Sequence, residues 1–249
     1  MLVDQRISIT TPSGQMDTWI FQPGETGVWP AVILHADIKG VRGVFVDMAR
    51  RLASHGFVVL LPNLYYRLSP APVVAPETSP RDDSGKELFR QLRQAISVEA
   101  VRSDHRILLD YLSGLVVVKN TGFGIVGYCL SGAIALRTAA DFPGRIVAAA
   151  SFHGGRLASD ADDSPHLRAA DIRAKVYLGY ARDDASMTDE MIAQLESSLA
   201  AAGVDYRSEL YPARHGFAVA DSASFDAGAA ERHWQRLLGF LDDALRETP

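Results

Sequence analysis

The segment Phe123–Leu136 reads FGIVGYCLSGAIAL and decides the fold of this chain. Its first half is a short, continuous apolar run, which is typical of a strand buried on both faces. Its second half is rich in alanine and leucine, which favour a helix. A Gly-x-Cys-x-Ser-Gly turn joins the two halves. The stretch therefore predicts a strand, a tight turn and a helix in direct succession.

Cys129 lies at the centre of this turn and is the expected nucleophile. A nucleophile elbow holds its central residue in strained geometry, so small residues must stand two positions to either side, as Gly127 and Ser131 do. The N-terminus of the following helix is expected to stabilise a thiolate, and its free N–H groups can hold an oxyanion. The alternative is that Cys129 is a small buried side chain that only packs.

The rest of the chain alternates between short apolar segments and amphipathic stretches of helical length. The further strands are expected at Arg6–Thr10, Thr18–Phe21, Ala31–His35, Phe57–Pro62, Ile146–Phe152, Val176–Tyr180 and Tyr206–Tyr211. Helices are expected at Val44–His55, Glu99–Ser113, Ser131–Asp141, Asp189–Ala202 and Ala229–Leu245. This alternation predicts an α/β fold with about eight strands in a mostly parallel sheet and helices on both faces. The first two strands, with a turn near Pro12–Gly14, are expected to form an antiparallel edge.

Composition narrows the class of protein. With 249 residues, 47% hydrophobic and 22% charged, the chain is expected to form one globular α/β domain over residues 1–249. A net charge of −5 gives no basic face for nucleic acid, and no apolar run approaches the ~20 residues of a membrane helix. The N-terminus lacks the pattern of a secretory signal, so a cytoplasmic protein is expected. The single cysteine excludes an intramolecular disulfide.

The segment Ser69–Asp83 departs from the alternation because it is rich in proline and lacks periodicity. We expect a long loop after a strand. Such a loop in a compact domain is either a functional lid or a mobile surface excursion, and the sequence leaves both open.

A cysteine nucleophile needs a base and a group that orients the base. His215, in LYPARHGFA, follows a predicted strand, and Asp183 and Asp184 follow an earlier one. The order nucleophile, acid, histidine is that of α/β hydrolases, and all these residues fall where open α/β sheets bind ligands. The alternatives are an exposed histidine without a role and aspartates that cap a helix. The other histidines considered are expected to be bystanders or packing groups: His35, His55, His105, His166 and His233.

With these residues the chain resembles the dienelactone hydrolase family of α/β hydrolases. The resemblance covers nearly the whole chain and rests on GYCLSG, ARDDASM, YPARHGF, PNLYYR, FHGG and ERHW. It implies an α/β-hydrolase fold and a catalytic triad of Cys129, Asp184 and His215. It also implies an oxyanion hole formed by the backbone N–H groups of Leu130 and Ile38.

Two positions depart from the family pattern. The family has a glutamate that keeps the resting thiol protonated, and this chain has Asp37 there. The family binds the substrate carboxylate with two arginines; Arg67 matches the first, and Val219 stands at the second. The resemblance thus assigns Asp37 to thiol modulation and Arg67 to substrate binding.

The leading hypothesis is a hydrolase that cleaves an ester or lactone, like a carboxymethylenebutenolidase, through an acyl-enzyme on Cys129. A thioesterase or general carboxylesterase is an alternative within the same class. A different class is a non-catalytic or redox-sensing protein on a hydrolase scaffold. We expect a small-molecule substrate, no cofactor or metal, no nucleic-acid or membrane partner, and a monomer or weak dimer.

Overall fold

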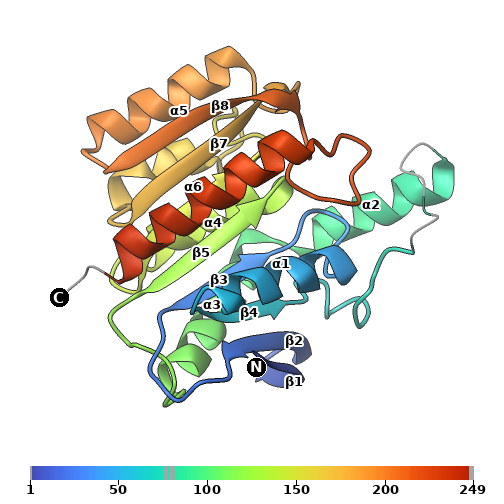
Figure 1. The fold of residues 1–249 in the computed structure, drawn as a ribbon. Helices are drawn as coiled ribbons and strands as arrows, with labels where there is room; N and C mark the ends of the chain where they lie inside the picture. The colour runs from blue at the N-terminus through green and yellow to red at the C-terminus, as the bar shows by residue number, and fades with distance from the viewer. Residues whose placement is uncertain (1, 76–77, 79–81, 247–249) are drawn as a thin grey trace.

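A single eight-stranded sheet runs through the computed structural model, which describes residues 2–75, 78 and 82–246. The strands are β1 (Leu2–Thr11), β2 (Gly14–Pro23), β3 (Ala31–His35), β4 (Val58–Pro62), β5 (Phe123–Tyr128), β6 (Ile146–Phe152), β7 (Lys175–Asp183) and β8 (Tyr206–Arg214). Their order across the sheet is β1-β2-β4-β3-β5-β6-β7-β8 (Figure 1). The β1–β2 and β2–β4 pairs are antiparallel and the others are parallel, which confirms the predicted fold class and its antiparallel edge.

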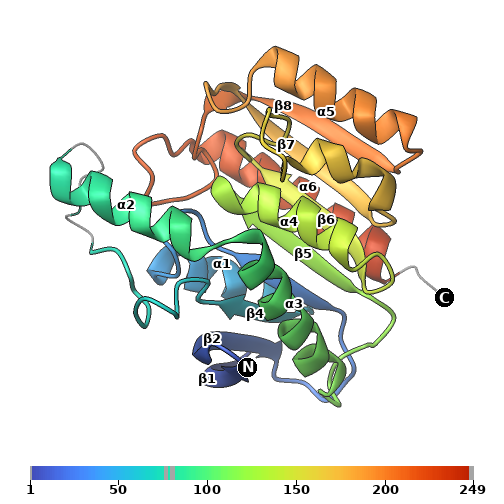
Figure 2. The ribbon, with the colours of Figure 1, turned by 180° about the vertical axis from the view of Figure 1, so that it is seen from behind.

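Helices cover both faces of the sheet. They are α1 (Gly43–Ser54), α2 (Asp83–Ala95), α3 (Val98–Ser113), α4 (Leu130–Asp141), α5 (Asp189–Ala201) and α6 (Ala227–Leu245). Figure 1 shows α1 and α6 on one face, and Figure 2 shows α3, α4 and α5 on the other. Side chains alternate along β3 accordingly: Val32 and Leu34 pack toward α1 and α6, and Ile33 packs toward the opposite helices. The sheet is therefore buried on both sides, as its continuous apolar strands predict.

Two elements are absent from the sequence-based prediction: α2 and a 3₁₀ helix at Pro165–Asp171. The former starts at the end of the expected loop Ser69–Asp83, where Asp82 caps it by accepting from Gly85 N at 2.7 Å. Residues 76–77 and 79–81 of that loop lie outside the described residues. Helix α2 extends away from the sheet (Figures 1 and 2) and buries few apolar side chains, including Phe89 and Leu92, because most of its residues are polar or charged.

Strands β7 and β8 run three residues further than the apolar pattern predicts, to Asp183 and Arg214. Their pairing shifts register between Ala181 and Asp183. As a result Asp184 and His215 each follow directly after a strand and stand at the same end of the sheet. In Figure 1 this end, with the loop between β8 and α6, is on the right.

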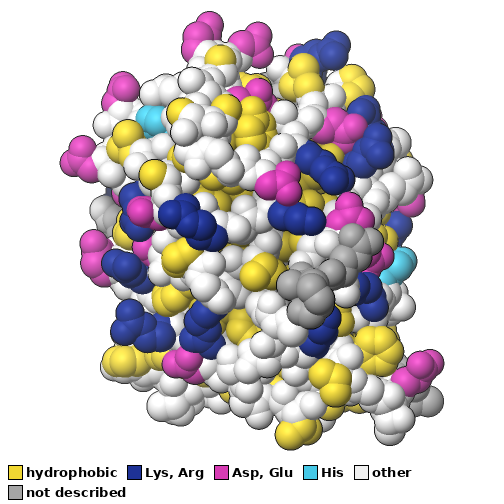
Figure 3. Space-filling view, turned by 90° about the vertical axis from the view of Figure 1, so that its left-hand side faces the viewer, with side chains coloured by type: hydrophobic (Ala, Val, Ile, Leu, Met, Phe, Trp, Pro, Cys, Tyr) yellow, Lys and Arg dark blue, Asp and Glu magenta, His cyan; other side chains and the backbone are white. Residues whose placement is uncertain are grey.

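The opposite end of the molecule is shown in Figure 3, where basic and acidic side chains are interspersed. Within the ranges that the structure describes, no helix is long and apolar enough to cross a membrane.

Candidate active site

The turn between β5 and α4 places Cys129 in backbone strain, with φ 57° and ψ −122°. Two glycines make this geometry possible. A Cβ on Gly127 would lie 2.0 Å from the Ser131 carbonyl oxygen, and a Cβ on Gly132 would lie 2.2 Å from Ser151 Oγ. Any larger residue at either position would collide, so the predicted strand, tight turn and helix have the form of a nucleophile elbow.

Ser131 fastens the elbow to the neighbouring strand. Its buried hydroxyl accepts from Tyr128 N at 2.8 Å and lies 3.2 Å from the carbonyl oxygen of His35, to which it can donate. His35 ends β3 and leads directly into the loop that carries Asp37 and Ile38. The turn that carries Cys129 and the expected oxyanion loop are thus connected through one side chain.

His215 and Asp184 form the second part of the site. Asp184 Oδ2 accepts from His215 Nδ1 at 2.6 Å. The other oxygen of Asp184 accepts from the backbone N and the hydroxyl of Ser186, at 2.9 and 2.6 Å. The Asp184 side chain is only 3% exposed, against 32% for His215. Asp183 instead ends β7, so the structure brings only Asp184 of this pair to the histidine.

The pKa of His215 is governed by its two neighbours. Burial lowers this pKa, but hydrogen bonds with the Asp184 and Cys129 side chains, and their negative charge, raise it to about 10. Burial also raises the pKa of Asp184, but the hydrogen bonds from His215 and Ser186 outweigh it and leave this pKa below its usual value. A protonated imidazole beside an ionised carboxylate is therefore the stable pair at neutral pH.

The three residues expected as a triad come together from the ends of β5, β7 and β8. Since His215 Nδ1 faces Asp184, Nε2 is the ring nitrogen left to interact with Cys129, which helps to raise the pKa of His215. Covalent acyl transfer needs a nucleophile, a group that moves its proton and a buried carboxylate that orients that group, and the expected assignment of these roles to Cys129, His215 and Asp184 stays a prediction.

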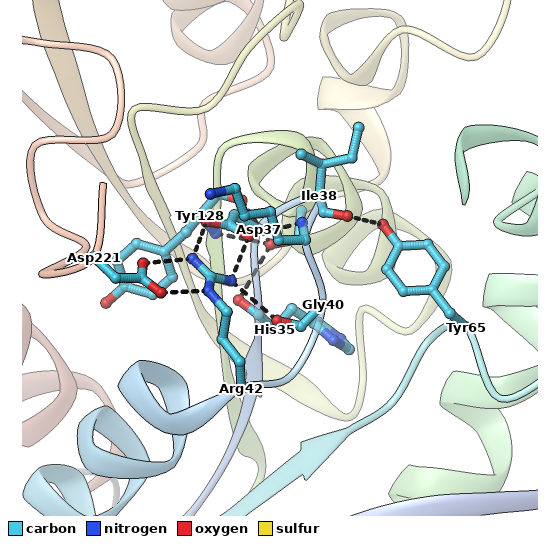
Figure 4. Close-up of polar contacts among 10 residues, drawn as sticks. His35, Asp37, Ile38, Gly40, Arg42, Tyr65, Tyr128 and Asp221 are labelled. Carbon is cyan, nitrogen blue, oxygen red and sulfur yellow. Dashed lines mark hydrogen bonds and ion pairs between the residues drawn. The ribbon is translucent and has the colours of Figure 1, made fainter. Parts of the chain in front are cut away.

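The expected oxyanion donors come from two elements, the start of α4 and the loop after β3. Leu130 is the first residue of α4, where helix geometry leaves the backbone N–H without an intrahelical partner. Ile38 lies in the loop after β3, and its carbonyl oxygen accepts from Tyr65 Oη at 3.0 Å (Figure 4). The role of both N–H groups as oxyanion donors stays a prediction.

Asp37 has partners other than the thiol. Its two carboxylate oxygens accept from Arg42 Nη1 and Nη2 at 2.8 and 2.9 Å, and one of them also accepts from Lys39 N at 2.9 Å (Figure 4). The expected action of Asp37 on Cys129 stays a prediction.

Arg67 also pairs within the protein. Its Nη1 and Nη2 donate to the two oxygens of Asp104, at 2.8 and 2.7 Å, and Tyr66 Oη donates to the same carboxylate at 2.9 Å. Asp104 is 1% exposed. Val219, at the place of the family's second arginine, is buried. The expected role of Arg67 toward a substrate carboxylate stays a prediction, and this site gives it a second, structural function.

His153 is a neighbour of the site that sequence reasoning missed, although FHGG contains it. Its ring lies edge-on to His215, with centroids 5.2 Å apart, and its φ is 38°. Burial, followed by the charge of His215, holds its pKa well below the usual value. Among the described residues neither ring nitrogen has a hydrogen-bond partner. A neutral imidazole therefore packs against the ring expected to move protons.

The other histidines have local partners. Tyr128 Oη donates to His233 Nε2 at 2.7 Å, His35 and His105 pair at 2.7 Å, and His166 bonds Ser164 and Gln194. His55 lies on the surface beside Arg51. Across the described ranges, no three His, Cys, Asp or Glu side chains gather in a way that could hold a metal ion.

Comparison with known proteins gives one consistent answer. The model of the dienelactone hydrolase family matches residues 16–245. A carboxymethylenebutenolidase of Rhodococcus opacus is 29% identical over 237 residues, covering 93% of this chain and 88% of the relative. A dienelactone hydrolase-like promiscuous phosphotriesterase from metagenomic libraries has the same fold, with a TM-score of 0.80, 21% identity, and coverage of 98% of this chain and 99% of that one.

A dienelactone hydrolase structure from Anabaena variabilis has a TM-score of 0.70 at 18% identity, and the match covers 98% of this chain and 99% of that one. At such identities the structural likeness shows the fold, whereas the family match spans nearly the entire sequence. The chain therefore belongs to the dienelactone hydrolase family and is a hydrolase with the α/β-hydrolase fold.

Proposed function

We propose that this hydrolase cleaves a small ester or lactone through an acyl-enzyme formed on Cys129. The observation that carries the proposal is the series Asp184–His215–Cys129 at a strained elbow, in which Asp184 accepts a hydrogen bond from His215 and the Cys129 side chain helps to raise the pKa of His215. Such a series serves acyl transfer, since it provides a nucleophile together with a group that can give and take a proton.

Acylation starts from the thiolate of Cys129 beside protonated His215. The sulfur attacks the substrate carbonyl, and the N–H groups of Leu130 and Ile38 hold the negative oxygen of the tetrahedral intermediate. When the C–O bond breaks, His215 gives its proton to the leaving alkoxide. The products of this half-reaction are an alcohol, a thioester on Cys129 and a neutral imidazole.

Deacylation needs that neutral imidazole, and the site provides for it. The pKa of His215 is about 10 partly because of the hydrogen bond and the charge of Cys129. A thioester carries neither, so acylation lowers the pKa of His215 and makes it a base. It then takes a proton from water, and the resulting hydroxide attacks the thioester. Collapse of the intermediate releases the acid and restores the thiolate–imidazolium pair.

The family supports the proposed substrate class, since the Rhodococcus opacus relative is a carboxymethylenebutenolidase. A small ester or lactone is therefore the first choice, with a thioester as the alternative in the same class. A redox role for Cys129 uses the same thiol but needs neither Asp184 nor His215.

The test compares the wild-type chain with Cys129→Ala and Cys129→Ser on p-nitrophenyl acetate and a simple lactone. We expect Cys129→Ala to remove turnover, and mass spectrometry of the wild type to show a transient acyl group on this residue. The chain has one cysteine, so any thiol-bound label lies on Cys129. Equal turnover in the alanine variant would contradict the mechanism. Reversible oxidation of a wild type that hydrolyses no ester would favour the redox alternative.

A further inference from the structure

The turn Asp37–Gly40, which carries Ile38, is held by few bonds of its own. Gly40 N donates to the Asp37 carbonyl at 2.9 Å, and Lys39 N donates to the Asp37 side chain at 2.9 Å. Both bonds join atoms within four residues. The orientation of the Ile38 N–H relative to Cys129 therefore depends on what holds this turn from outside.

Arg42 holds it from the start of α1. Its Nη1 donates to Asp37 Oδ1 at 2.8 Å and to the Gly40 carbonyl at 3.1 Å, and its Nη2 donates to Asp37 Oδ2 at 2.9 Å. Its Nε and Nη2 donate to the two oxygens of Asp221 at 2.6 and 2.8 Å. Figure 4 shows the guanidinium between the two carboxylates. All five N–H groups of the fork are engaged, which fixes its plane as well as its position.

The two carboxylates belong to different parts of the site. Asp37 precedes Ile38, and Asp221 lies in the loop that follows His215. The Arg42 and Asp37 side chains are 13% and 14% exposed, so this pair is largely shielded from water. One arginine thus joins the loop expected to hold the oxyanion to the loop that carries the histidine.

Tyr65 gives the turn a second support. Its hydroxyl donates to the Ile38 carbonyl at 3.0 Å, on the opposite side of the turn from Arg42 (Figure 4). Burial, with the charges of Asp37 and Cys129, raises the pKa of Tyr65, so its hydroxyl stays protonated and remains a donor.

We propose that Arg42 is a positioning residue that orients the Ile38 N–H as an oxyanion donor and keeps the Asp37 carboxylate from opposing the oxyanion. The inference rests on the proposed function, because it concerns the tetrahedral intermediate of that reaction. Two physical effects join in it. The bidentate pairs fix the turn, and the guanidinium neutralises a carboxylate next to the place where negative charge develops.

The alternative is that Arg42 only adds stability, as many ion pairs between loops do. The two readings differ in one respect. Alkylation of a thiolate by iodoacetamide passes through no oxyanion, whereas ester hydrolysis does. A residue that acts through the oxyanion hole therefore changes the rate of ester hydrolysis and leaves the rate of alkylation unchanged.

The experiment uses Arg42→Gln and, as a matched control, Arg51→Gln. Arg51 lies on the same helix and pairs with Glu231 at 3.0 Å, away from the turn. For Arg42→Gln we expect kcat on p-nitrophenyl acetate to fall about 10²-fold with KM nearly unchanged, the loss found when one oxyanion donor is removed. The rate of Cys129 alkylation by iodoacetamide should stay within about twofold. Arg51→Gln should keep both rates.

Tyr65→Phe and Asp221→Asn provide the test if Arg42→Gln does not fold. Each removes one support of the same network, and each should lower kcat without slowing alkylation. Unchanged kcat in Arg42→Gln, or in both of the other variants, overturns the proposal. So does a loss of alkylation that matches the loss of hydrolysis, because the whole site is then disturbed. A wild type without thiol-dependent turnover would instead overturn the proposed function itself.

Discussion

The two sides of the site follow different rules. On the triad side, at the ends of β5, β7 and β8, the expected triad residues Cys129, Asp184 and His215 interact with one another: Asp184 accepts from His215, and Cys129 helps to raise the pKa of His215. On the oxyanion side, in the loops after β3 and β4, Asp37 and Arg67 bond side chains of this protein.

This difference suggests that the triad side determines the reaction, whereas the side chains of the oxyanion side determine which substrate is accepted. Proton transfer between fixed atoms tolerates little change, so the triad side is recognisable residue by residue. The oxyanion side needs only backbone N–H groups at the right place, and the side chains around them can differ. The family therefore predicts the reaction better than the substrate. A substrate carboxylate would have to compete with Asp104 for Arg67, and with Asp37 and Asp221 for Arg42.

Asp184→Asn would break the triad side most strongly. An amide at this position can present its NH₂ to His215 Nδ1, which favours the wrong tautomer and removes the charge that stabilises the imidazolium. We expect kcat to fall by about 10⁴-fold, the effect known for this change in Ser-His-Asp enzymes. Asp183→Asn is the matched control and should retain activity in the same steady-state assay. Similar losses in both variants would mean that the orienting carboxylate is wrongly assigned.

Arg67→Met tests the oxyanion side. It leaves Asp104, which is 1% exposed, without its guanidinium partner, while Tyr66 still donates to it. We expect the free energy of unfolding in urea to fall by about 3 kcal/mol, at the low end for a broken buried pair. The double variant Arg67→Met with Asp104→Asn should regain part of this loss. Intact stability with KM raised only for anionic esters would instead assign Arg67 to the substrate.

Cys129→Ala tests, without any substrate, whether Cys129 and His215 interact on the triad side. Removing the sulfur deletes both the hydrogen bond and the charge that help to raise the pKa of His215 to about 10. We expect this pKa to shift down toward the usual value of about 6.5, as measured by NMR titration of the imidazole. Asp184 remains, so the fall should be partial. An unchanged pKa would show that the histidine and the cysteine do not interact.

The sequence predicted the elements whose residues interact locally or repeat with a clear period. The strands Ala31–His35 and Ile146–Phe152 have the predicted bounds because each is an apolar run covered on both faces. The glycines around Cys129 identify the elbow, since no other residue fits there. The sequence did not predict helix α2, because few of its residues are apolar and a glycine lies in its first turn.

Partners of charged side chains could not be predicted in the same way. Arg42 and Asp221 are separated by 179 residues, and Arg67 and Asp104 by 37. The chain has 25 basic and 30 acidic residues, and nothing local selects one pairing among so many. His153 could have been predicted as a neighbour of the site, because in FHGG it follows a strand that ends on the same side of the sheet as the expected triad.

The smallest effect is expected on the pH dependence of stability, from the buried pair His35–His105. His35 ends β3, just before the loop of the oxyanion side. His105 Nδ1 donates to the Val101 carbonyl at 2.7 Å, so its Nε2 accepts from His35 Nε2 at 2.7 Å, and both rings are neutral. Burial lowers the pKa of both histidines, so below about pH 6.5 the unfolded chain binds protons that the folded chain does not.

The contribution of this pair to stability should therefore be complete above pH 6.5 and fall as the pH decreases, by about 0.8 kcal/mol for each such histidine at pH 6. Urea unfolding between pH 7.5 and 5.5 measures this slope. The double variant His35→Gln with His105→Gln should reduce this slope, because glutamine does not titrate, and the remainder should come from His153 and His233. His55→Gln, on the surface, is the control and should keep the wild-type slope. If the double variant keeps it too, the pair is not the source, and the acid sensitivity belongs to His153 and His233, whose pKa values burial also lowers.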